Sequence, residues 1–302
     1  MRLTTAMDRF LIEKREQPCS IHTIRTYKGA IKLFIQHVIH ETGNEATLHF
    51  TETMVRSFFA HKDAQARDVK RKTLSVYQTA LREFARWGVR RRYWSDDPFA
   101  DIRTIKYVKG LPRPFTAAEL DRLMAVPLSG DEEVLRAVLY YGGVREFEAC
   151  GLRIEDIEPP ARAGEVAKLT ILGKKQKVRK VSIPPPCWSL VSAQSARRAN
   201  QDPTPQAPLF AKRDGKPWTP RMVQRRVRAW GRAAEVHDCK PHRFRHTCAT
   251  DMLEAGEDIR VIQQVLGHSS LDTTAIYTMV TNRRLDAAAM RLRTFDKTSD
   301  SH

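Results

Sequence analysis

The chain has 302 residues, of which 41% are hydrophobic, so it is long enough for two domains that each bury a core. It carries 52 Lys and Arg against 35 Asp and Glu, and the net charge of +17 favours a nucleic acid as partner over an anionic membrane surface. The N-terminus lacks the apolar core of a signal peptide, and no apolar run approaches the length of a membrane span. Five scattered cysteines without a CxxC pair argue against a disulfide framework or a zinc ribbon. We therefore expect a cytoplasmic protein that binds no membrane.

The first third of the chain has the pattern of a helical domain. Ser20 is a suitable N-cap for a helix, and Gly43 stands where that helix should end. Further helices are expected from about residue 53 and over residues 69–87. The apolar side chains predicted to share the buried face of the first of these helices are Ile21, Ile24, Ile31, Phe34, Ile35 and Val38.

Basic residues cluster at both ends of the third predicted helix and recur in a helix expected over residues 220–235. Each is predicted to contact DNA, although a solvated surface position is the alternative reading. These DNA-binding candidates are Lys70, Arg71, Lys72, Arg90, Arg91, Arg92 and Arg225.

A linker is predicted over residues 106–115, where Gly110, Pro112 and Pro114 interrupt regular structure. Thr116 and Glu119 then have the spacing of a capping box, which predicts that a second domain opens with a helix. The predicted division is a helical DNA-binding domain over 1–105, the linker, and a second domain over 116–302.

The second domain is predicted to combine helices with a small β-sheet. Residues 166–172 and 178–183 are β-rich and are joined by the basic segment 173–177, which predicts a hairpin. Helices are expected over residues 117–126, 131–142, 147–152, 220–235, 242–255 and 258–265, from Leu271, and over 283–296. The predicted fold class is therefore mainly α with a small β-sheet in the C-terminal domain, that is, a helical bundle followed by an α+β domain.

Six side chains of the second domain carry the groups that phosphodiester transfer needs. An arginine fork binds two phosphate oxygens, a lysine can protonate the leaving oxygen, and a histidine can accept a proton or bond the phosphate. A tyrosine can attack phosphorus once nearby arginines lower its pKa from about 10. The candidates are Arg145, Lys174, His242, Arg245, His268 and Tyr277. Each of these residues taken singly could have an ordinary structural or surface role. The prediction of an active site therefore depends on all six occurring together in this order along the chain.

Two further side chains bear on this site. Glu148 is three residues after Arg145, and this spacing predicts an ion pair that orients the guanidinium. His242 and His246 have the spacing of a zinc pair, but neighbouring arginines would repel a cation, so no metal is predicted.

Four stretches, GGVREFEACGLRIEDI, ILGKKQKVRKVSIP, HRFRHTCAT and LGHSSLDTTAIYT, resemble the tyrosine recombinase (phage integrase) family, including its Xer-type members. The resemblance implies a two-domain DNA clamp in which Arg145 and Arg245 bind phosphate and Tyr277 is the nucleophile. It also implies that Lys174 is the general acid, that His242 and His268 assist, and that Glu148 supports the site. The family hairpin often reads GKG, so Lys175 and Lys177 remain alternatives to Lys174.

The resemblance implies a reaction without metal, cofactor or ATP. Tyr277 would form a 3′-phosphotyrosyl bond, and two strand exchanges would pass through a Holliday junction. The implied partners are double-stranded DNA at a specific site and further protomers, as a homo-tetramer on two sites or a hetero-tetramer with a partner recombinase. A helix over residues 283–296 would dock on a neighbouring protomer or close its own domain, and the protein would associate with a nucleoid.

Three alternative functions fit part of the pattern. A type IB topoisomerase-like enzyme would share the chemistry but relax supercoils. A non-catalytic DNA-binding protein could keep the same fold. A metal-dependent nuclease is disfavoured because the sequence has no suitable carboxylate cluster.

Overall fold

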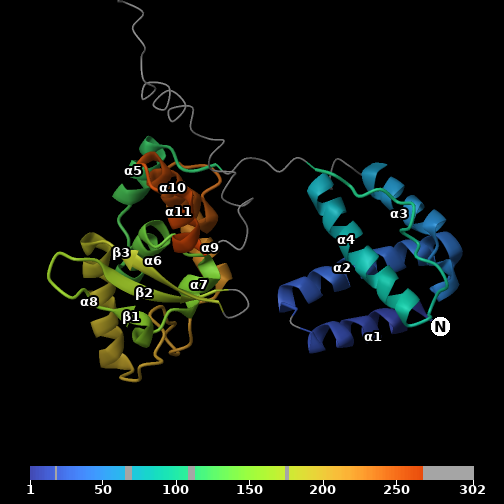
Figure 1. Ribbon diagram of the computed structural model, residues 1–302, viewed down its shortest axis with the longest axis horizontal. Coiled ribbons are helices and arrows are strands. Elements are labelled where there is room, and N and C mark those ends of the chain that lie inside the picture. The colour runs from blue at the N-terminus through green and yellow to red at the C-terminus, as the bar shows by residue number, and fades with distance from the viewer. Residues whose placement is uncertain (18, 65–69, 108–112, 174–176, 268–302) are drawn as a thin grey trace, which may run out of the picture. The chain divides into compact units, whose positions relative to one another are not determined.

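A computed structural model describes residues 1–17, 19–64, 70–107, 113–173 and 177–267. The described residues form two compact units, one within residues 1–109 and the other within residues 110–302 (Figure 1). The predictions for Lys174, Lys175, His268, Tyr277 and the helix over 283–296 lie outside the described residues. Within the described ranges, no helix is both long enough and apolar enough to cross a bilayer.

The first unit is helical, as predicted. Its helices are α1 (Leu3–Glu16), α2 (Ile21–Thr42), α3 (Glu52–Ala64) and α4 (Arg71–Arg90), with a 3-10 turn at Thr47–His49. Of these, α1 was not predicted individually.

The ends of α2 follow the predicted signals. The Ser20 hydroxyl accepts a hydrogen bond from the Thr23 N–H at 3.1 Å, and Gly43 ends the helix in the left-handed conformation. The prediction that Ile21 is buried is wrong, since it is 70% exposed. Ile24 is the first residue of α2 that the core covers, so the first turn of the helix projects beyond the packed helices.

Aromatic rings fill the core of the first unit. Phe84 stacks on Trp87 with ring centroids 5.8 Å apart and meets Phe10 at 5.4 Å. Trp94 packs so closely on α4 that a Cβ at Gly88 would lie 1.8 Å from its ring, and its indole N–H donates to the Ala85 carbonyl. Gly88 therefore has no room for a side chain, and this close contact holds Trp94 against the last turns of α4.

The second unit combines helices with a three-stranded antiparallel sheet of order β1-β2-β3 (Figure 1). The strands are β1 (Ile157–Glu158), β2 (Ala167–Leu172) and β3 (Val178–Ile183). The helices are α5 (Ala117–Ala125), α6 (Gly130–Tyr141), α7 (Glu146–Gly151), α8 (Pro185–Gln201), α9 (Pro220–Ala233), α10 (Pro241–Glu254) and α11 (Ile259–Leu266), with a 3-10 turn at Ile154–Asp156.

The predicted hairpin is present, with Ala167 opposite Ile183 and Leu172 opposite Val178. Alternate residues of β2 point inward onto a core that also contains Phe244 of α10. The helix α8 was not predicted, because the prolines at 184–186, of which the last two begin the helix, indicated only the end of a strand. Proline is well placed in a first helical turn, where its missing N–H has no partner to lose.

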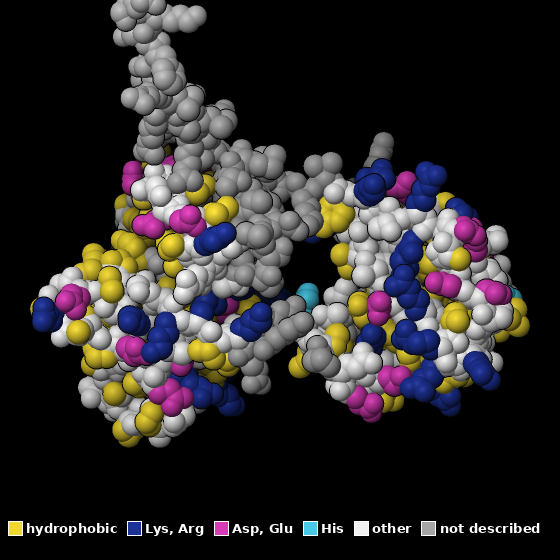
Figure 2. Space-filling model, viewed as in Figure 1, with side chains coloured by type: hydrophobic (Ala, Val, Ile, Leu, Met, Phe, Trp, Pro, Cys, Tyr) yellow, Lys and Arg dark blue, Asp and Glu magenta, His cyan; other side chains and the backbone are white. Residues whose placement is uncertain are grey.

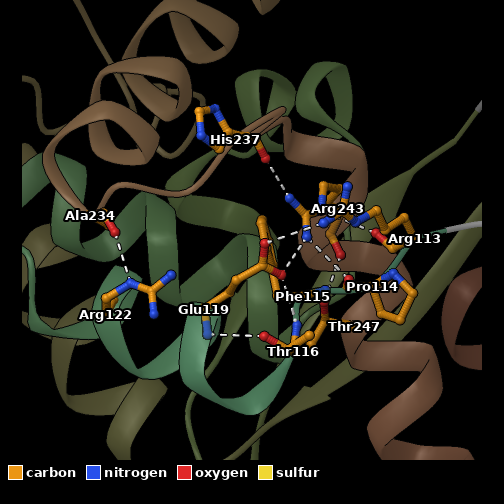
Figure 3. A network of polar contacts seen from close by, with 10 residues as sticks. All are labelled: Arg113, Pro114, Phe115, Thr116, Glu119, Arg122, Ala234, His237, Arg243 and Thr247. Carbon is orange, nitrogen blue, oxygen red and sulfur yellow. Dashed lines mark hydrogen bonds and ion pairs between the residues drawn. The ribbon is translucent and has the colours of Figure 1, made fainter.

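Arg243 of α10 holds the chain where it enters the second unit (Figure 3). Its guanidinium forms an ion pair with Glu119 at 2.7 Å and lies 4.1 Å from the centroid of the Phe115 ring. It also donates hydrogen bonds to the carbonyl oxygens of Arg113 (3.1 Å), Pro114 (3.2 Å) and His237 (2.7 Å). One buried cation therefore ties the incoming segment to α5 and to the loop before α10.

The predicted capping box completes this anchor (Figure 3). The Thr116 hydroxyl accepts from the Glu119 N–H at 3.2 Å, and the Glu119 carboxylate accepts from the Thr116 N–H at 3.0 Å. One residue earlier, the Phe115 N–H donates to the Thr247 hydroxyl of α10 at 2.8 Å. The start of α5 is thus set both by its own sequence and by α10.

Candidate active site

Arg145 stands immediately before α7 and is held there by Glu148. The Glu148 carboxylate accepts hydrogen bonds from the Arg145 backbone N–H and from its Nη1, each at 2.9 Å. The ion pair predicted from the spacing of these residues is therefore present. The Glu148 side chain is fully buried, whereas that of Arg145 is 26% exposed, so a buried acid orients a guanidinium that solvent can reach.

A second arginine, Arg179 of β3, binds the same carboxylate. Its Nη1 and Nη2 donate to the two Glu148 oxygens at 3.0 and 2.8 Å, and its Nε donates to the Val265 carbonyl of α11 at 2.9 Å. Burial alone would raise the pKa of Glu148, but the hydrogen bonds and charges of Arg179 and Arg145 hold it below its usual value. Glu148 is therefore a carboxylate in the folded protein. Arg179 was not among the predicted site residues, although its position soon after the hairpin tip was a visible signal.

Arg245 lies on α10 and is 2% exposed. Its Nη1 donates to the Gly143 carbonyl at 2.6 Å, and its Nη2 donates to the Leu266 carbonyl at 2.5 Å. These bonds join the loop before α7 to the last turn of α11. Arg245 therefore connects the segment that carries Arg145 to the segment that leads to His268.

His242 precedes Arg245 by one turn of α10 and reaches the surface. Desolvation of the His242 ring by the surrounding protein lowers its pKa. The charge of Glu146 opposes this shift, and the charges of Arg245 and Arg145 add to it. The ring of His246 lies 5.2 Å from that of His242, centroid to centroid, and its pKa is lowered to about 4, chiefly by burial. Both imidazoles are therefore mainly neutral at pH 7, and each can accept a proton.

Gly173 and Gly267, which directly precede the candidates Lys174 and His268, both lie beside the pair of Glu148 and Arg179. The Gly173 N–H donates to the Lys177 carbonyl at 2.8 Å, and a Cβ on Gly173 would lie 3.7 Å from a Glu148 oxygen. Gly267 ends α11 with a φ of 64°, and a Cβ there would lie 2.8 Å from the Arg179 Cδ. The residues that immediately precede Lys174 and His268 therefore both pack beside the Glu148–Arg179 pair.

A row of exposed arginines follows one face of α9. The row consists of Arg221, Arg225, Arg228 and Arg232, whose spacing of four, three and four residues keeps them on one side of a helix. Gln224 of the same helix donates to the Glu146 carboxylate at 3.2 Å, and Glu146 is next to Arg145 in the chain. Of the row, only Arg225 was predicted, although the same spacing was readable for the other three.

The basic candidates of the first unit are exposed on its surface, and Figure 2 shows Lys and Arg side chains gathered in a band across one face of this unit. The six are Lys70, Arg71, Lys72, Arg90, Arg91 and Arg92. Arg91 also forms an ion pair with Glu13 of α1 at 2.8 Å. Among the residues that the structure describes, no three His, Cys, Asp or Glu side chains lie close enough together to hold a metal ion.

Comparison with known proteins assigns this architecture to a family. The model of the phage integrase family matches residues 114–284, and the model of the phage integrase N-terminal SAM-like domain matches residues 8–92. The chain belongs to the phage integrase family and is an Xer-like tyrosine recombinase.

Its relatives are similar over nearly their whole length. Tyrosine recombinase XerC of Methylobacterium nodulans is 32% identical over 289 residues, which cover 91% of this chain and 88% of that protein. Tyrosine recombinase XerC of Mycobacterium sp. (strain JLS) is 31% identical over 294 residues, which cover 93% of this chain and 95% of that protein.

Solved structures share the fold at lower identity. XerH site-specific recombinase bound to palindromic difH substrate, in a post-cleavage complex, matches with a TM-score of 0.74 and 22% identity over 90% of this chain and 80% of that chain. A lambda integrase tetramer bound to a Holliday junction matches with a TM-score of 0.69 and 14% identity over 99% of this chain and 80% of that chain.

Proposed function

We propose that this protein is a site-specific DNA recombinase that cuts and rejoins DNA strands through Tyr277. The observation that carries the proposal is that Arg145, held by Glu148, and Arg245, held by the Gly143 carbonyl, lie on different elements and yet both lie near enough to His242 for their charges to lower its pKa. Two guanidinium groups held in place near an imidazole can stabilise the charged oxygens of a pentavalent phosphorus in the transition state. The net charge of +17 supports DNA as the substrate.

The chemistry proceeds in two balanced steps. The Tyr277 oxygen attacks the scissile phosphorus and forms a 3′-phosphotyrosyl bond, while the bond to the 5′ oxygen breaks. Lys174, with Lys175 and Lys177 as the alternatives, protonates that leaving oxygen. Arg145 and Arg245 stabilise the non-bridging oxygens. The 5′ hydroxyl of a partner strand then attacks the phosphotyrosine and releases the tyrosine, so the bond energy is kept and no ATP is needed.

The remaining groups have supporting roles. His242 accepts the tyrosine proton or donates a hydrogen bond to the phosphate, and His268 assists at the same phosphate. Glu148 orients Arg145. The arginine row of α9 and the basic candidates of the first unit contact the DNA backbone, which positions the duplex without reading its sequence.

The assembly is proposed from the same family relationship. Residues 1–105 act as a DNA core-binding domain, residues 106–115 as the linker, and residues 116–302 as the catalytic domain. Four protomers bring two DNA sites together, and residues 283–296 dock on a neighbouring protomer. The lambda integrase tetramer on a Holliday junction supports this arrangement. The protein would then lie in the cytoplasm with the nucleoid.

The test starts from DNA duplexes that this protein enriches from a random-sequence library. A nicked form of the enriched duplex traps the covalent intermediate, since the short strand beyond the nick diffuses away after cleavage. The wild-type protein should yield a protein–DNA complex that survives SDS. The Tyr277→Phe variant should bind the duplex within about threefold of the wild type, because one hydroxyl is a small part of the interface, yet yield no such complex.

Two results would contradict the proposal. One is a covalent complex that persists in Tyr277→Phe, which would assign the nucleophile elsewhere. The other is a wild-type protein that relaxes supercoiled plasmid carrying the enriched sequence but never exchanges strands between two such sites. That outcome would favour a topoisomerase-like enzyme.

A further inference from the structure

We propose that Arg179 is a positioning residue for DNA cleavage, an inference that rests on the proposed function. It acts through two neighbours. Through Glu148 it sets the orientation and the available charge of Arg145, and through Val265 it sets the place where the chain leaves α11.

Both oxygens of the Glu148 carboxylate accept hydrogen bonds from Arg145 and from Arg179. Its Oε1 accepts from Arg145 Nη1 at 2.9 Å and from Arg179 Nη1 at 3.0 Å. Its Oε2 accepts from the Arg145 backbone N–H at 2.9 Å and from Arg179 Nη2 at 2.8 Å. Four donors on one buried carboxylate leave it a single orientation, so the Arg145 side chain that it bonds is held as well.

Arg179 also determines the net charge around Arg145. A carboxylate bound only to Arg145 would cancel the charge that the scissile phosphate needs. Because Arg179 supplies a second cation, the trio of Arg145, Glu148 and Arg179 keeps a net charge of about +1. The buried Arg179–Glu148 pair is neutral by itself, so Glu148 can orient Arg145 without neutralising it.

Arg179 also holds the end of α11. The last carbonyls of a helix lack partners within the helix. The Val265 carbonyl accepts from Arg179 Nε, and the next carbonyl, that of Leu266, accepts from Arg245 Nη2. Gly267 then lies against the Arg179 side chain, where a Cβ would meet the Arg179 Cδ at 2.8 Å. Two arginines thus fix the backbone that leads directly into His268.

Arg179 differs from both of the proposed phosphate-binding arginines. It is more buried than Arg145, and two of its nitrogens donate to a carboxylate, whereas Arg245 donates to the neutral carbonyl groups of Gly143 and Leu266. The Arg179 side chain is 11% exposed, against 26% for that of Arg145. Its Nε, Nη1 and Nη2 all donate to protein oxygens. Arg179 is therefore occupied within the protein and acts on the phosphate through Arg145.

The experiment measures single-turnover cleavage of the nicked, library-selected duplex at saturating protein, together with DNA affinity. Arg179→Gln should slow cleavage about 100-fold, the loss expected when a reacting group is displaced by about 1 Å, and should leave affinity within about threefold. Arg179→Lys keeps the positive charge but loses the bidentate hydrogen bonds to Glu148, so its cleavage rate should lie between those of Arg179→Gln and the wild type. The control is Arg198→Gln, which removes a buried arginine of α8 that donates to the Pro208 carbonyl, and it should cleave at the wild-type rate.

Two further readouts separate positioning from a general loss of structure. In an Arg145→Ala background, Arg179→Gln should slow cleavage by clearly less than about 100-fold, because the part of its effect that acts through Arg145 is already lost and only the part that acts through Val265 remains. A duplex with a neutral methylphosphonate at the scissile position needs less positive charge, so the effect of Arg179→Gln should shrink to about tenfold or less.

The outcomes distinguish the two proposals. If the wild-type protein cleaves and Arg179→Gln cleaves equally fast, this inference is overturned while the proposed function stands. Equal slowing by Arg179→Gln in the wild-type and Arg145→Ala backgrounds also overturns it. A wild-type protein that forms no covalent complex with any selected duplex overturns the proposed function, and this inference falls with it.

Discussion

The Arg245 guanidinium donates a hydrogen bond to the Gly143 carbonyl oxygen at 2.6 Å, across 102 residues of sequence. Gly143 has a φ of 54°, in the left-handed region that favours glycine. This conformation turns the chain from α6 toward Arg145. The buried Arg245 thus supports the loop that leads into the partly exposed Arg145.

Replacing Gly143 with alanine should destabilise the protein. A Cβ there would lie 2.8 Å from the Leu266 Cδ2 and 3.2 Å from the Cys248 Sγ, in addition to the strained φ. We expect a loss of about 2–4 kcal/mol in the free energy of unfolding, measured with urea. The control is Gly164→Ala, where φ is 86° but nothing lies within 4 Å, so only strain of about 1 kcal/mol applies. Equal losses in both variants would contradict the steric argument.

His246 should make the protein less stable in mild acid. Its pKa is lowered to about 4 by burial, by His242 and by Arg245, whereas an unfolded histidine titrates near 6.5. As the pH falls from about 6.5 toward 4, the unfolded chain therefore binds a proton before the folded protein does, and stability is lost. The loss from this group is on the order of 2–3 kcal/mol.

The measurement compares urea unfolding at pH 7 and pH 4.5. His246→Gln should lose less stability than the wild type between these two values, because it has no imidazole to protonate. His22→Gln is the control, since the His22 side chain is exposed, and it should follow the wild type. If His246→Gln also follows the wild type, His246 is not the titrating group.

Local signals in the sequence predicted the contacts that lie within one turn. The spacing of Arg145 and Glu148 predicted their ion pair, and the spacing of Thr116 and Glu119 predicted a capping box. Both depend on a few successive residues and on helix geometry alone, so no knowledge of the tertiary fold was needed.

Contacts between distant segments could not be predicted in this way. Arg179 meets Glu148 across 31 residues and Val265 across 86, so its partners depend on how β3 packs against α7 and α11. Ile21 continued the apolar pattern of α2, but the extent of the core decides whether that position is covered. The periodicity indicates which face of a helix is apolar, and tertiary packing determines how far along the helix that face is buried.

Arg243→Gln should weaken the start of the second unit. The substitution removes the buried ion pair with Glu119 and the bonds to three carbonyl groups. We expect the free energy of unfolding to fall by about 3–5 kcal/mol, the usual cost of leaving a buried charge without its partner. Arg113→Gln is the control, since Arg113 is 71% exposed and lies 3.8 Å from Glu119, and it should lose about 0.5 kcal/mol or less. Urea unfolding of both variants tests this, and similar losses would contradict the assignment of the anchor to Arg243.

The arginine row of α9 should contribute to DNA affinity through phosphate contacts. The double variant Arg225→Gln, Arg228→Gln removes two charges that the structure exposes on one face of α9. If both contact phosphates, the slope of log affinity against log salt should become shallower by about 1.8, since each contact contributes about 0.9.

The control removes the same charge elsewhere. Arg162→Gln, Lys216→Gln takes two exposed cations from loops outside α9 and should change the salt slope little. Titration of the enriched duplex at several salt concentrations measures both slopes. Because phosphate contacts are independent of base sequence, the α9 variant should weaken binding to enriched and scrambled duplexes by similar factors. A loss confined to the enriched duplex would instead place Arg225 or Arg228 on base edges.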